Sequence, residues 1–331
     1  MRHTQIVLSC LLMIPTLSGA AEIPGATLRS AVQKGLSLLE KTNPTFIQKG
    51  GCNSCHNQML PAAAQAYAQQ RGIPTGPVIA QLPPELNEFT TERIIEGNSF
   101  GANSLGYELF ANALTKRPAD ARILSQTYYL KSVQQPEGLW RTAGNRPPLT
   151  IDDFTTTAYA IHALKTYATD TDRADNEARI ARARSWLLEA KPRTTQERAF
   201  QLLGLAWSKA SREALDKGVR GLEATQGEDQ GWSQLPALPS DAFATGIALL
   251  ALHEAGMPAS HATYQSGLRY LLSTQAADGT WHVKARSLPV QPYFESGYPY
   301  GHDQWISAAA AAYATMAIAA AVETQQTAQK R

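Results

Sequence analysis

The segment YLKSVQQPEGLW at residues 129–140 decides the fold class, because it recurs as YLLSTQAADGTW at residues 270–281. The two copies share Tyr, Leu, Gln, Gly and Trp at the same five positions. In each copy a helical stretch ends near the Gln, and the chain turns through the Gly, which tolerates the backbone angles of such a turn, onto the Trp. Reuse of this unit predicts a repeat protein made of helices.

Looser copies of the unit lie between these two segments and before them. Trp186 is followed by Lys191 at the place of the Gln, Gln226 is followed by Trp232, and an early copy has Asn43 at the Gln place. The steps between copies differ widely in length. This variation favours helical hairpins with loops of different length over a leucine-rich or tetratricopeptide array of fixed period.

The pattern resembles the QW repeat of the squalene-hopene cyclase and oxidosqualene cyclase family, which protein prenyltransferase β subunits share more loosely. The resemblance covers about residues 27–322. It implies that the outer helices of a toroid carry the repeat, and that the Gln amide and the Trp ring tie each helix end to the next turn. The physical chemistry agrees, because a Gln side chain can satisfy the carbonyls left free at a helix C-terminus.

Small, apolar segments between the expected outer helices suit the centre of a helical toroid. The expected inner helices are Pro61–Gln70, Asn103–Thr115, Thr155–Ala168, Thr195–Ser208, Ala242–Ala255 and Trp305–Val322. The expected outer helices are Thr27–Lys41, Pro84–Glu96, Ala119–Val133, Asn176–Ala190, Arg212–Thr225 and Ser260–Thr274. Six alternating pairs predict an all-α, α6/α6 toroid, a single domain over residues 21–322 that is followed by a polar C-terminal tail at residues 323–331.

Residues 1–20 have the features of a cleaved signal peptide. Arg2 and His3 precede an apolar run from Ile6 to Leu17, and small residues close the segment at Ala20. The run is too short to span a bilayer. We therefore expect an exported protein, periplasmic or secreted, with no membrane span.

The composition bounds the remaining possibilities. The chain has 331 residues, of which 44% are apolar, and a net charge of +2. It is long enough for one large core or two small ones, and it is not basic enough to predict a nucleic acid partner. The apolar stretch Ile306–Val322 is rich in Ala and includes Ser307, Tyr313 and Thr315, so it predicts a buried helix.

The segment CNSCH at residues 52–56 holds both cysteines that remain after the signal peptide is removed. Its spacing is that of the attachment motif for c-type haem. Cys52 and Cys55 can form thioethers with the two haem vinyl groups, and His56 then lies under the iron as an axial metal ligand. Such haem is attached outside the cytoplasm, so the motif and the signal peptide support each other. A Cys52–Cys55 disulfide and half of a zinc site are the alternatives.

The sequence leaves the second axial ligand open. Met59 follows His56 by three residues and lies on the same side of the iron, so we exclude it. The other candidates are His162, His253, His261, His282, His302 and Met257. No compact cytochrome domain surrounds the motif, which we expect in the loop after the first helix, so a haem there must lean on the helical body.

Three acidic residues, Asp152, Asp241 and Asp303, stand at the start of expected inner helices. An Asp at this place can cap a helix by accepting hydrogen bonds from its free amides. Capping alone is one interpretation. The other is that repeat symmetry gathers the three acids at one rim of the toroid, at the mouth of a pocket.

The cyclase family protonates its substrate with an Asp in the motif Asp-x-Asp-Asp-Thr-Ala. The nearest segment is IDDFTTTA at residues 151–158, which carries over Asp152 and Asp153 as catalytic acids but has Phe154 where a Thr belongs. The zinc ligands of the prenyltransferases, an Asp-x-Cys and a distant His, have no match because no third mature Cys exists. Prenyl transfer by that chemistry is therefore set aside.

The loop after Trp281 is rich in aromatic residues and prolines from Pro289 to Trp305. Aromatic faces stabilise carbocations or stack on apolar ligands, and such loops also simply pack. In this loop His302 and Asp303 are adjacent and could donate and accept protons as catalytic residues.

Three functions follow from these patterns. The first is a haem-bearing binding or electron-transfer protein, whose toroid holds an apolar small molecule and which exchanges electrons with a periplasmic redox partner. The second is an enzyme related to terpenoid cyclases, or another toroid enzyme, that uses Asp152 and Asp153 or His302 and Asp303. The third is a non-catalytic interaction scaffold with a Cys52–Cys55 disulfide.

Overall fold

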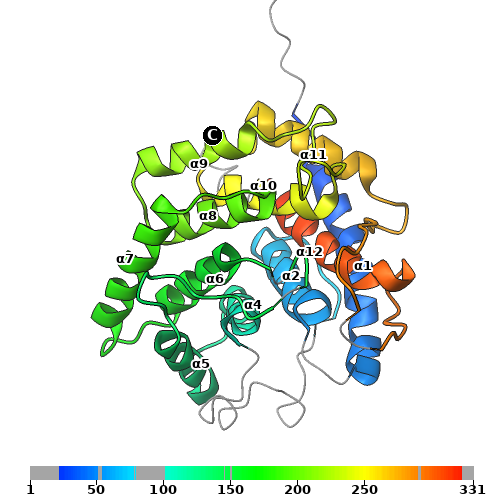
Figure 1. The fold of residues 1–331 in the computed structure, drawn as a ribbon. Helices are drawn as coiled ribbons and strands as arrows, with labels where there is room; N and C mark the ends of the chain where they lie inside the picture. The colour runs from blue at the N-terminus through cyan, green and yellow to red at the C-terminus, as the bar shows by residue number, and fades with distance from the viewer. Residues whose placement is uncertain are drawn as a thin grey trace, which may run out of the picture.

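The computed structural model describes residues 22–50, 54–77, 79, 101–144, 146–149, 151–289 and 292–322. In this part of the chain the regular secondary structure is helical, apart from isolated bridge residues such as the pair Ser233 and Ser240. The helices lie in two layers around a common centre (Figure 1). The predicted signal peptide, the predicted outer helix Pro84–Glu96, the C-terminal tail and Cys52 lie outside the described residues.

The inner layer of the described part is a ring of helices. Its members are α2 (Leu60–Gln70), α4 (Gly101–Leu114), α6 (Asp153–Thr166), α8 (Thr195–Trp207), α10 (Ala242–Glu254) and α12 (Gln304–Ala320). Each packs on the next, and α12 packs on α2, so the ring closes. Small residues allow this close approach: every residue of α12 is buried, and a Cβ added at Gly246 of α10 would meet the backbone of Tyr313 and Ala314.

The outer layer covers this ring. Its described members are α1 (Gly25–Gly50), α5 (Ala121–Ser132), α7 (Arg173–Glu189), α9 (Arg212–Glu223) and α11 (Ala262–Thr274). From α4 to α12 inner and outer helices alternate along the chain, as do α1 and α2, and the outer helices pack on their inner neighbours. This arrangement confirms the all-α toroid, and the inner helices lie within two residues of their predicted bounds.

The Trp of each repeat closes the turn after an outer helix. The indole Nε1 atoms of Trp140, Trp232 and Trp281 donate to the carbonyls of Leu130, Leu222 and Leu271 at 2.6, 2.9 and 2.9 Å. All three indoles are 2% exposed or less. Each Trp therefore satisfies a helix C-terminal carbonyl and fills the space between the two layers.

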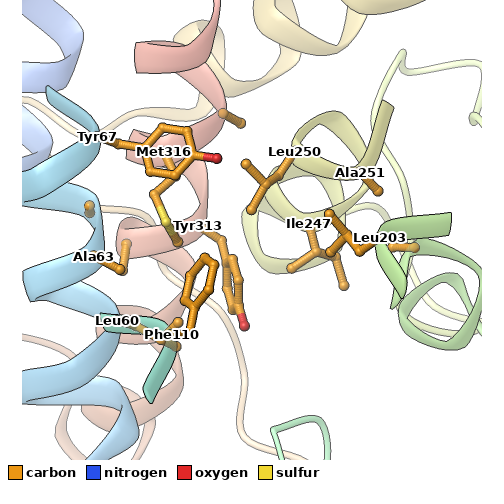
Figure 2. Packing of buried hydrophobic residues seen from close by; sticks show 14 of the residues in the cluster. Leu60, Ala63, Tyr67, Phe110, Leu203, Ile247, Leu250, Ala251, Tyr313 and Met316 are labelled. Carbon is orange, nitrogen blue, oxygen red and sulfur yellow. The ribbon is translucent and has the colours of Figure 1, made fainter. Parts of the chain in front are cut away.

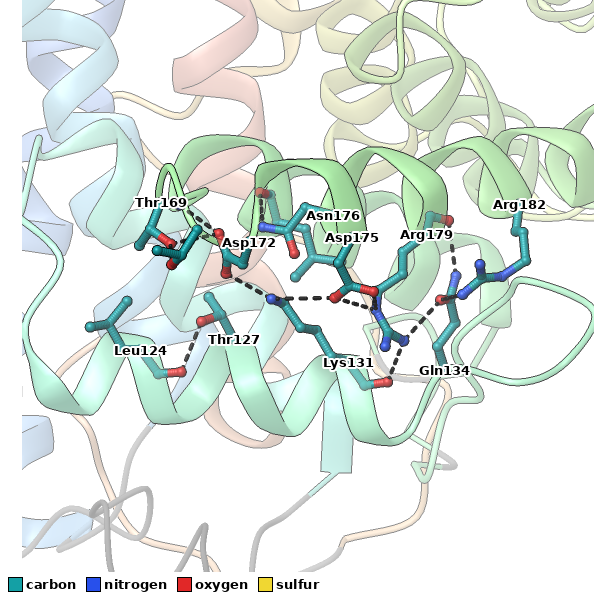
Figure 3. A network of polar contacts seen from close by, with 12 residues as sticks. Leu124, Thr127, Lys131, Gln134, Thr169, Asp172, Asp175, Asn176, Arg179 and Arg182 are labelled. Atoms are coloured by element: carbon teal, nitrogen blue, oxygen red, sulfur yellow. Dashed lines mark hydrogen bonds and ion pairs between the residues drawn. The ribbon is translucent and has the colours of Figure 1, made fainter.

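The Gln of each repeat ties one outer helix to the next. The Gln134 amide donates to the carbonyls of Gly138, in its own turn, and Arg179 in α7, at 2.8 and 3.0 Å. Figure 3 shows the bond from Gln134 to Arg179 beside Lys131, whose amine lies 2.7 Å from a carboxylate oxygen of Asp172. Gln226 binds carbonyls of its own turn and of α11 in the same way.

The last repeat closes the ring onto the first helix. The Gln275 amide donates to the carbonyls of Gly279 and of Ala31 in α1, both at 3.0 Å. The backbone amide of Ile23 also donates to the side-chain oxygen of Gln265 in α11 at 3.0 Å. The first outer helix is thereby tied to the last outer helix.

The first outer helix differs from its prediction. We expected it to end at Lys41, but α1 continues through Pro44 to Gly50. The extension buries Phe46, which is 2% exposed and packs on the rings of His56 and Phe294. Burial of this side chain outweighs the hydrogen bond that Pro44 cannot donate.

Aromatic side chains fill the centre of the ring. The hydroxyls of Tyr159 and Tyr313 lie 2.7 Å apart, and both side chains are 1% exposed or less. These residues come from α6 and α12, which are three places apart in the ring and therefore face each other across the axis. Figure 2 shows Phe110 of α4, Tyr313 of α12 and Ile247 of α10 pointing into the same space. At this level side chains from opposite walls meet, and no ligand-sized channel separates them.

Candidate functional site

The second half of the CNSCH motif begins an inner helix. Residues Cys55–Met59 form one π-helical turn that leads directly into α2. The Ser54 hydroxyl caps this turn by accepting from the Asn57 amide at 3.1 Å. The expected loop is therefore wrong for these residues, because the cap and the π-turn extend the helix back to Cys55. π-helical turns are frequent at functional sites.

The turn holds His56 inside the protein. The imidazole is 5% exposed, and its centre lies 5.6 Å from the ring of Phe46 and 5.9 Å from that of Trp305. Its Nδ1 atom lies 3.8 Å from the Sγ atom of Cys55. Burial, and then the nearby charge of Arg146, hold the pKa of His56 well below its usual value. The ring is therefore neutral near pH 7, which is the form that binds metals.

A cavity of about 280 Å³ opens beside His56. Its wall brings together the π-helical turn η1 (Cys55–Met59), the C-terminal half of α1 and the loop before α12. Its lining includes His56, Asn57, Phe46, Arg146, Leu288, Tyr293, Phe294, His302, Gln304 and Trp305. The aromatic loop predicted from the sequence thus contributes to a cavity as well as to packing.

The wall carries polar groups that face apolar surroundings. The guanidinium of Arg146 lies 4.1 Å from the ring centre of Trp305, a cation–π contact. The Nδ2 atom of Asn57 is buried and has no hydrogen-bond partner in the described part of the chain. Leu288 and Tyr293 at the border are 86% and 45% exposed. The cavity offers donors and a positive charge beside aromatic and aliphatic surface.

His302 and Asp303 both line this cavity, but their side chains contact different partners and not each other. Asp303 accepts from the Ala285 amide at 2.8 Å, and its other oxygen lies 2.8 Å from Nε2 of His282. It makes no side-chain cap on α12, so the capping interpretation is wrong for Asp303. The ring of His302 packs on Tyr293, with 4.4 Å between ring centres.

Asp152 and Asp153 lie apart from the cavity lining. Asp152 caps α6 by accepting from the Thr155 amide at 2.7 Å, and the Gln196 amide donates to it at 2.6 Å. Burial raises its pKa to about 6.

Asp153 accepts from the Thr142 amide at 2.8 Å and pairs with Arg141 at 3.1 Å. Capping is confirmed for Asp152 and likewise for Asp241, which accepts from the Ala244 amide at 2.9 Å; catalysis by these acids stays a prediction.

The sequence did not indicate a role at the cavity for three of its residues, Phe46, Asn57 and Arg146. Phe46 was missed because α1 was expected to end before it, and Asn57 because it stands inside the motif without a role of its own. Arg146 stands in a connecting segment, where the sequence carries no signal that would place it beside Trp305. In the described residues no group of three His, Cys, Asp or Glu side chains could hold a metal ion, and no helix is long and apolar enough to cross a membrane.

Comparisons with known proteins define the fold class. No model of a protein family matches the sequence, and no curated protein matches it. A protein from Actinoplanes has a similar structure, with a TM-score of 0.55 and 14% identity over 89% of this chain and 100% of its own. A type II terpene cyclase from Scytonema, in complex with geranylgeranyl dihydroxybenzoate, has a TM-score of 0.55 and 12% identity over 90% and 98% of the two chains. The protein therefore has an α/α-toroid fold that is similar to the fold of this terpene cyclase.

Proposed function

We propose that this protein is an exported c-type haem protein that works in electron transfer or redox sensing. Cys52 and Cys55 would carry the haem as thioethers, and His56 would be an axial ligand. The observation that supports this most is the position of His56, which is buried, uncharged and part of the wall of a cavity. A c-type attachment motif needs such an imidazole on its haem side.

Several residues of the cavity have the chemistry that a haem needs, while the Cys55 thiol lies outside the cavity lining, 3.8 Å from Nδ1 of His56. Phe46, Phe294 and Trp305 provide flat apolar surface for the macrocycle. Arg146 provides a positive charge for a propionate, because a guanidinium binds carboxylates well. A haem is larger than a cavity of about 280 Å³, so part of it would lie outside the cavity. That part would cover the exposed apolar side chain of Leu288.

When bound, the haem would supply an iron that changes its charge by one electron. The protein would tune that change by the means that its own residues offer. His56 keeps its ring neutral and ready to bind the iron, and the aromatic wall excludes water from it. The positive charge of Arg146 would favour the more reduced state of the site.

The filled centre of the toroid argues against a cyclase. The type II terpene cyclase from Scytonema is named with a geranylgeranyl substrate, and a substrate of that length needs a long apolar chamber. Here Tyr159 and Tyr313 meet across the axis. The apolar ligand proposed from the sequence therefore has its best place at the rim cavity beside His56, and an enzyme that uses Asp152 and Asp153 is the weaker proposal.

The experiment is a visible spectrum of the protein, purified from a periplasm that matures c-type cytochromes, together with its pyridine haemochrome. We expect the spectrum of a haem whose two vinyl groups are saturated. N-terminal sequencing of the same sample tests export, with Ala21 expected as the first residue. A colourless protein with a Cys52–Cys55 disulfide would contradict the proposal and favour the interaction scaffold.

A further inference from the structure

The cavity beside His56 has a continuous aromatic wall. The ring centre of Phe46 lies 5.5 Å from that of Phe294 and 5.6 Å from that of His56. The ring centre of His56 in turn lies 5.9 Å from that of Trp305. All four side chains line the cavity, and both Phe46 and Trp305 meet His56 edge to face. A further aromatic ring can join such an arrangement, so the wall favours a ligand with a flat apolar group.

Hydrogen-bond donors stand beside this wall. The guanidinium of Arg146 lies 4.1 Å from the ring centre of Trp305, at the end of the row of rings. Asn57 is 2% exposed, and its Nδ2 atom has no hydrogen-bond partner among the described residues. A buried donor without a partner costs free energy that an acceptor on a ligand would restore. Both residues line the cavity, and a guanidinium favours a carboxylate as its acceptor.

The lining also includes an acid, Asp303, which is engaged elsewhere. One of its carboxylate oxygens accepts from the Ala285 amide at 2.8 Å, and the other lies 2.8 Å from Nε2 of His282. Its negative charge repels a ligand carboxylate, whereas the positive charge of Arg146 attracts it. An anionic ligand is therefore oriented in the cavity, with its acid group beside Arg146 and its apolar part on the aromatic wall.

The size of the cavity limits the ligand. A protein cavity of about 150 Å³ accepts benzene. The cavity beside His56 has a volume of about 280 Å³. The larger volume leaves room for a carboxylate and a short chain in addition to one ring.

We propose that this cavity binds a small aromatic monocarboxylate, whose ring packs on Phe46 and Trp305 and whose carboxylate is bound by Arg146 and the amide of Asn57. This inference goes beyond the proposed function and does not rest on it, because the polypeptide alone forms the site. Leu288 and Tyr293, which are 86% and 45% exposed, border the cavity and mark its opening to solvent. A haem in this cavity would compete with the ligand for Arg146, so the two proposals are tested on different forms of the protein.

The test is isothermal titration calorimetry of the full chain, purified from a host that does not attach haem, with three probes. The first, 3-phenylpropanoate, carries both the ring and the acid. The second, 3-phenylpropanamide, lacks the charge, and the third, acetate, lacks the ring. We expect 3-phenylpropanoate to bind at least about tenfold more tightly than either of the other two, because it alone uses both the aromatic wall and Arg146.

Variants locate the ligand in the cavity. Arg146→Met should weaken the binding of 3-phenylpropanoate by about tenfold or more and change that of 3-phenylpropanamide little, since Met removes the charge and keeps an apolar side chain beside Trp305. Asn57→Leu should weaken both probes, because each offers an oxygen to the buried donor. Arg141→Met is the matched control and should change neither affinity. The Arg141 side chain is 62% exposed, pairs with Asp153 and lies outside the described lining of the cavity.

The probes decide the proposal on wild type even where a variant fails to fold. Equal affinities for 3-phenylpropanoate and 3-phenylpropanamide, or no binding of 3-phenylpropanoate at millimolar concentration, would overturn it. An affinity for 3-phenylpropanoate that is unchanged in a folded Arg146→Met variant would overturn it as well. Covalent haem, present or absent in protein matured with c-type cytochromes, changes none of these outcomes.

Discussion

The turns that join outer to inner helices in this toroid differ in kind. After α5, α9 and α11 the chain passes through Gln, Gly and Trp, and each turn makes the same bonds to the helix before it and to its outer neighbour. At the matching positions α1 has Asn43, Ile47 and Lys49 in place of Gln, Gly and Trp. Asn43 takes the Gln place, where its amide donates to the carbonyl of Asn57 at 3.1 Å, and the CNSCH motif follows.

The difference shows how a repeat fold can hold a new site. The regular turns tie α5 to α7, α9 to α11 and α11 to α1 without help from the turn after α1. The residues of that turn are therefore free to contribute side chains to a site. The turn places a neutral imidazole at the rim, beside a loop that the last repeat supplies.

The largest effect should come from the glycines of the regular turns. Gly279 has φ of 89°, and a Cβ added to it would overlap the carbonyl of Lys34, which is backbone and cannot yield cheaply. Gly279→Ala should lower the free energy of unfolding by about 3 kcal/mol or more, since strain and overpacking add. Urea unfolding followed by circular dichroism measures it.

Two controls divide that loss into its causes. Gly72 has φ of 63° but open space around a new Cβ, so Gly72→Ala should cost only about 1 kcal/mol. Gly221 lies inside α9 with nothing near its Cβ, so Gly221→Ala should be neutral or slightly stabilising. Equal losses in all three variants would show that the close approach of the regular turn to α1 is unimportant.

The next effect tests the bond that closes the ring. Gln275→Ala removes both hydrogen bonds of that amide and leaves the carbonyl of Ala31 without this partner. We expect a loss of about 1–3 kcal/mol in the free energy of unfolding. Gln69→Ala is the control, because the Gln69 amide bonds only to Thr75 at an exposed site. If the two variants unfold alike, the bonds of Gln275 do not hold the ring closed.

The third effect is a dependence on pH at the helix that follows a regular turn. Burial raises the pKa of Asp152 from 3.8 to about 6. The folded state therefore holds a proton that the unfolded chain releases, and this carboxyl contributes stability that is present below pH 3.8 and lost as the pH rises through about 6. The slope is at most about 1.4 kcal/mol for each pH unit.

Asp152→Asn removes this proton equilibrium while keeping a side chain that can cap α6. The stability of wild type relative to Asp152→Asn should fall between pH 4 and pH 6 and stay constant above that, in thermal unfolding at a series of pH values. A constant difference over the whole range would contradict the raised pKa of Asp152.

Much of the fold could be predicted because the repeat carries it in local patterns. Tyr129 to Trp140 and Tyr270 to Trp281 place helix ends and turns, and the small-residue segments place the inner ring. The missed end of α1 has the opposite cause, since Pro44 and the polar residues near it favour a stop. The burial of Phe46, a contact distant in sequence, overrides that preference.

The site could be predicted only in part. The CNSCH motif and the aromatic loop were found as separate patterns, because each is local. Their meeting at one cavity, the contact of Arg146 with Trp305 and the pairing of Asp303 with His282 depend on long-range packing, which spacing along the chain does not encode.

Haem on the turn after α1 is tested most directly by the intact mass of the denatured protein, purified from a host that matures c-type cytochromes. A wild-type chain that carries the mass of one haem, and a Cys52→Ser/Cys55→Ser variant that has the mass of the bare chain, are the predicted results. A wild-type chain with the mass of the bare polypeptide, two hydrogens lighter for a disulfide or not, would contradict the haem site.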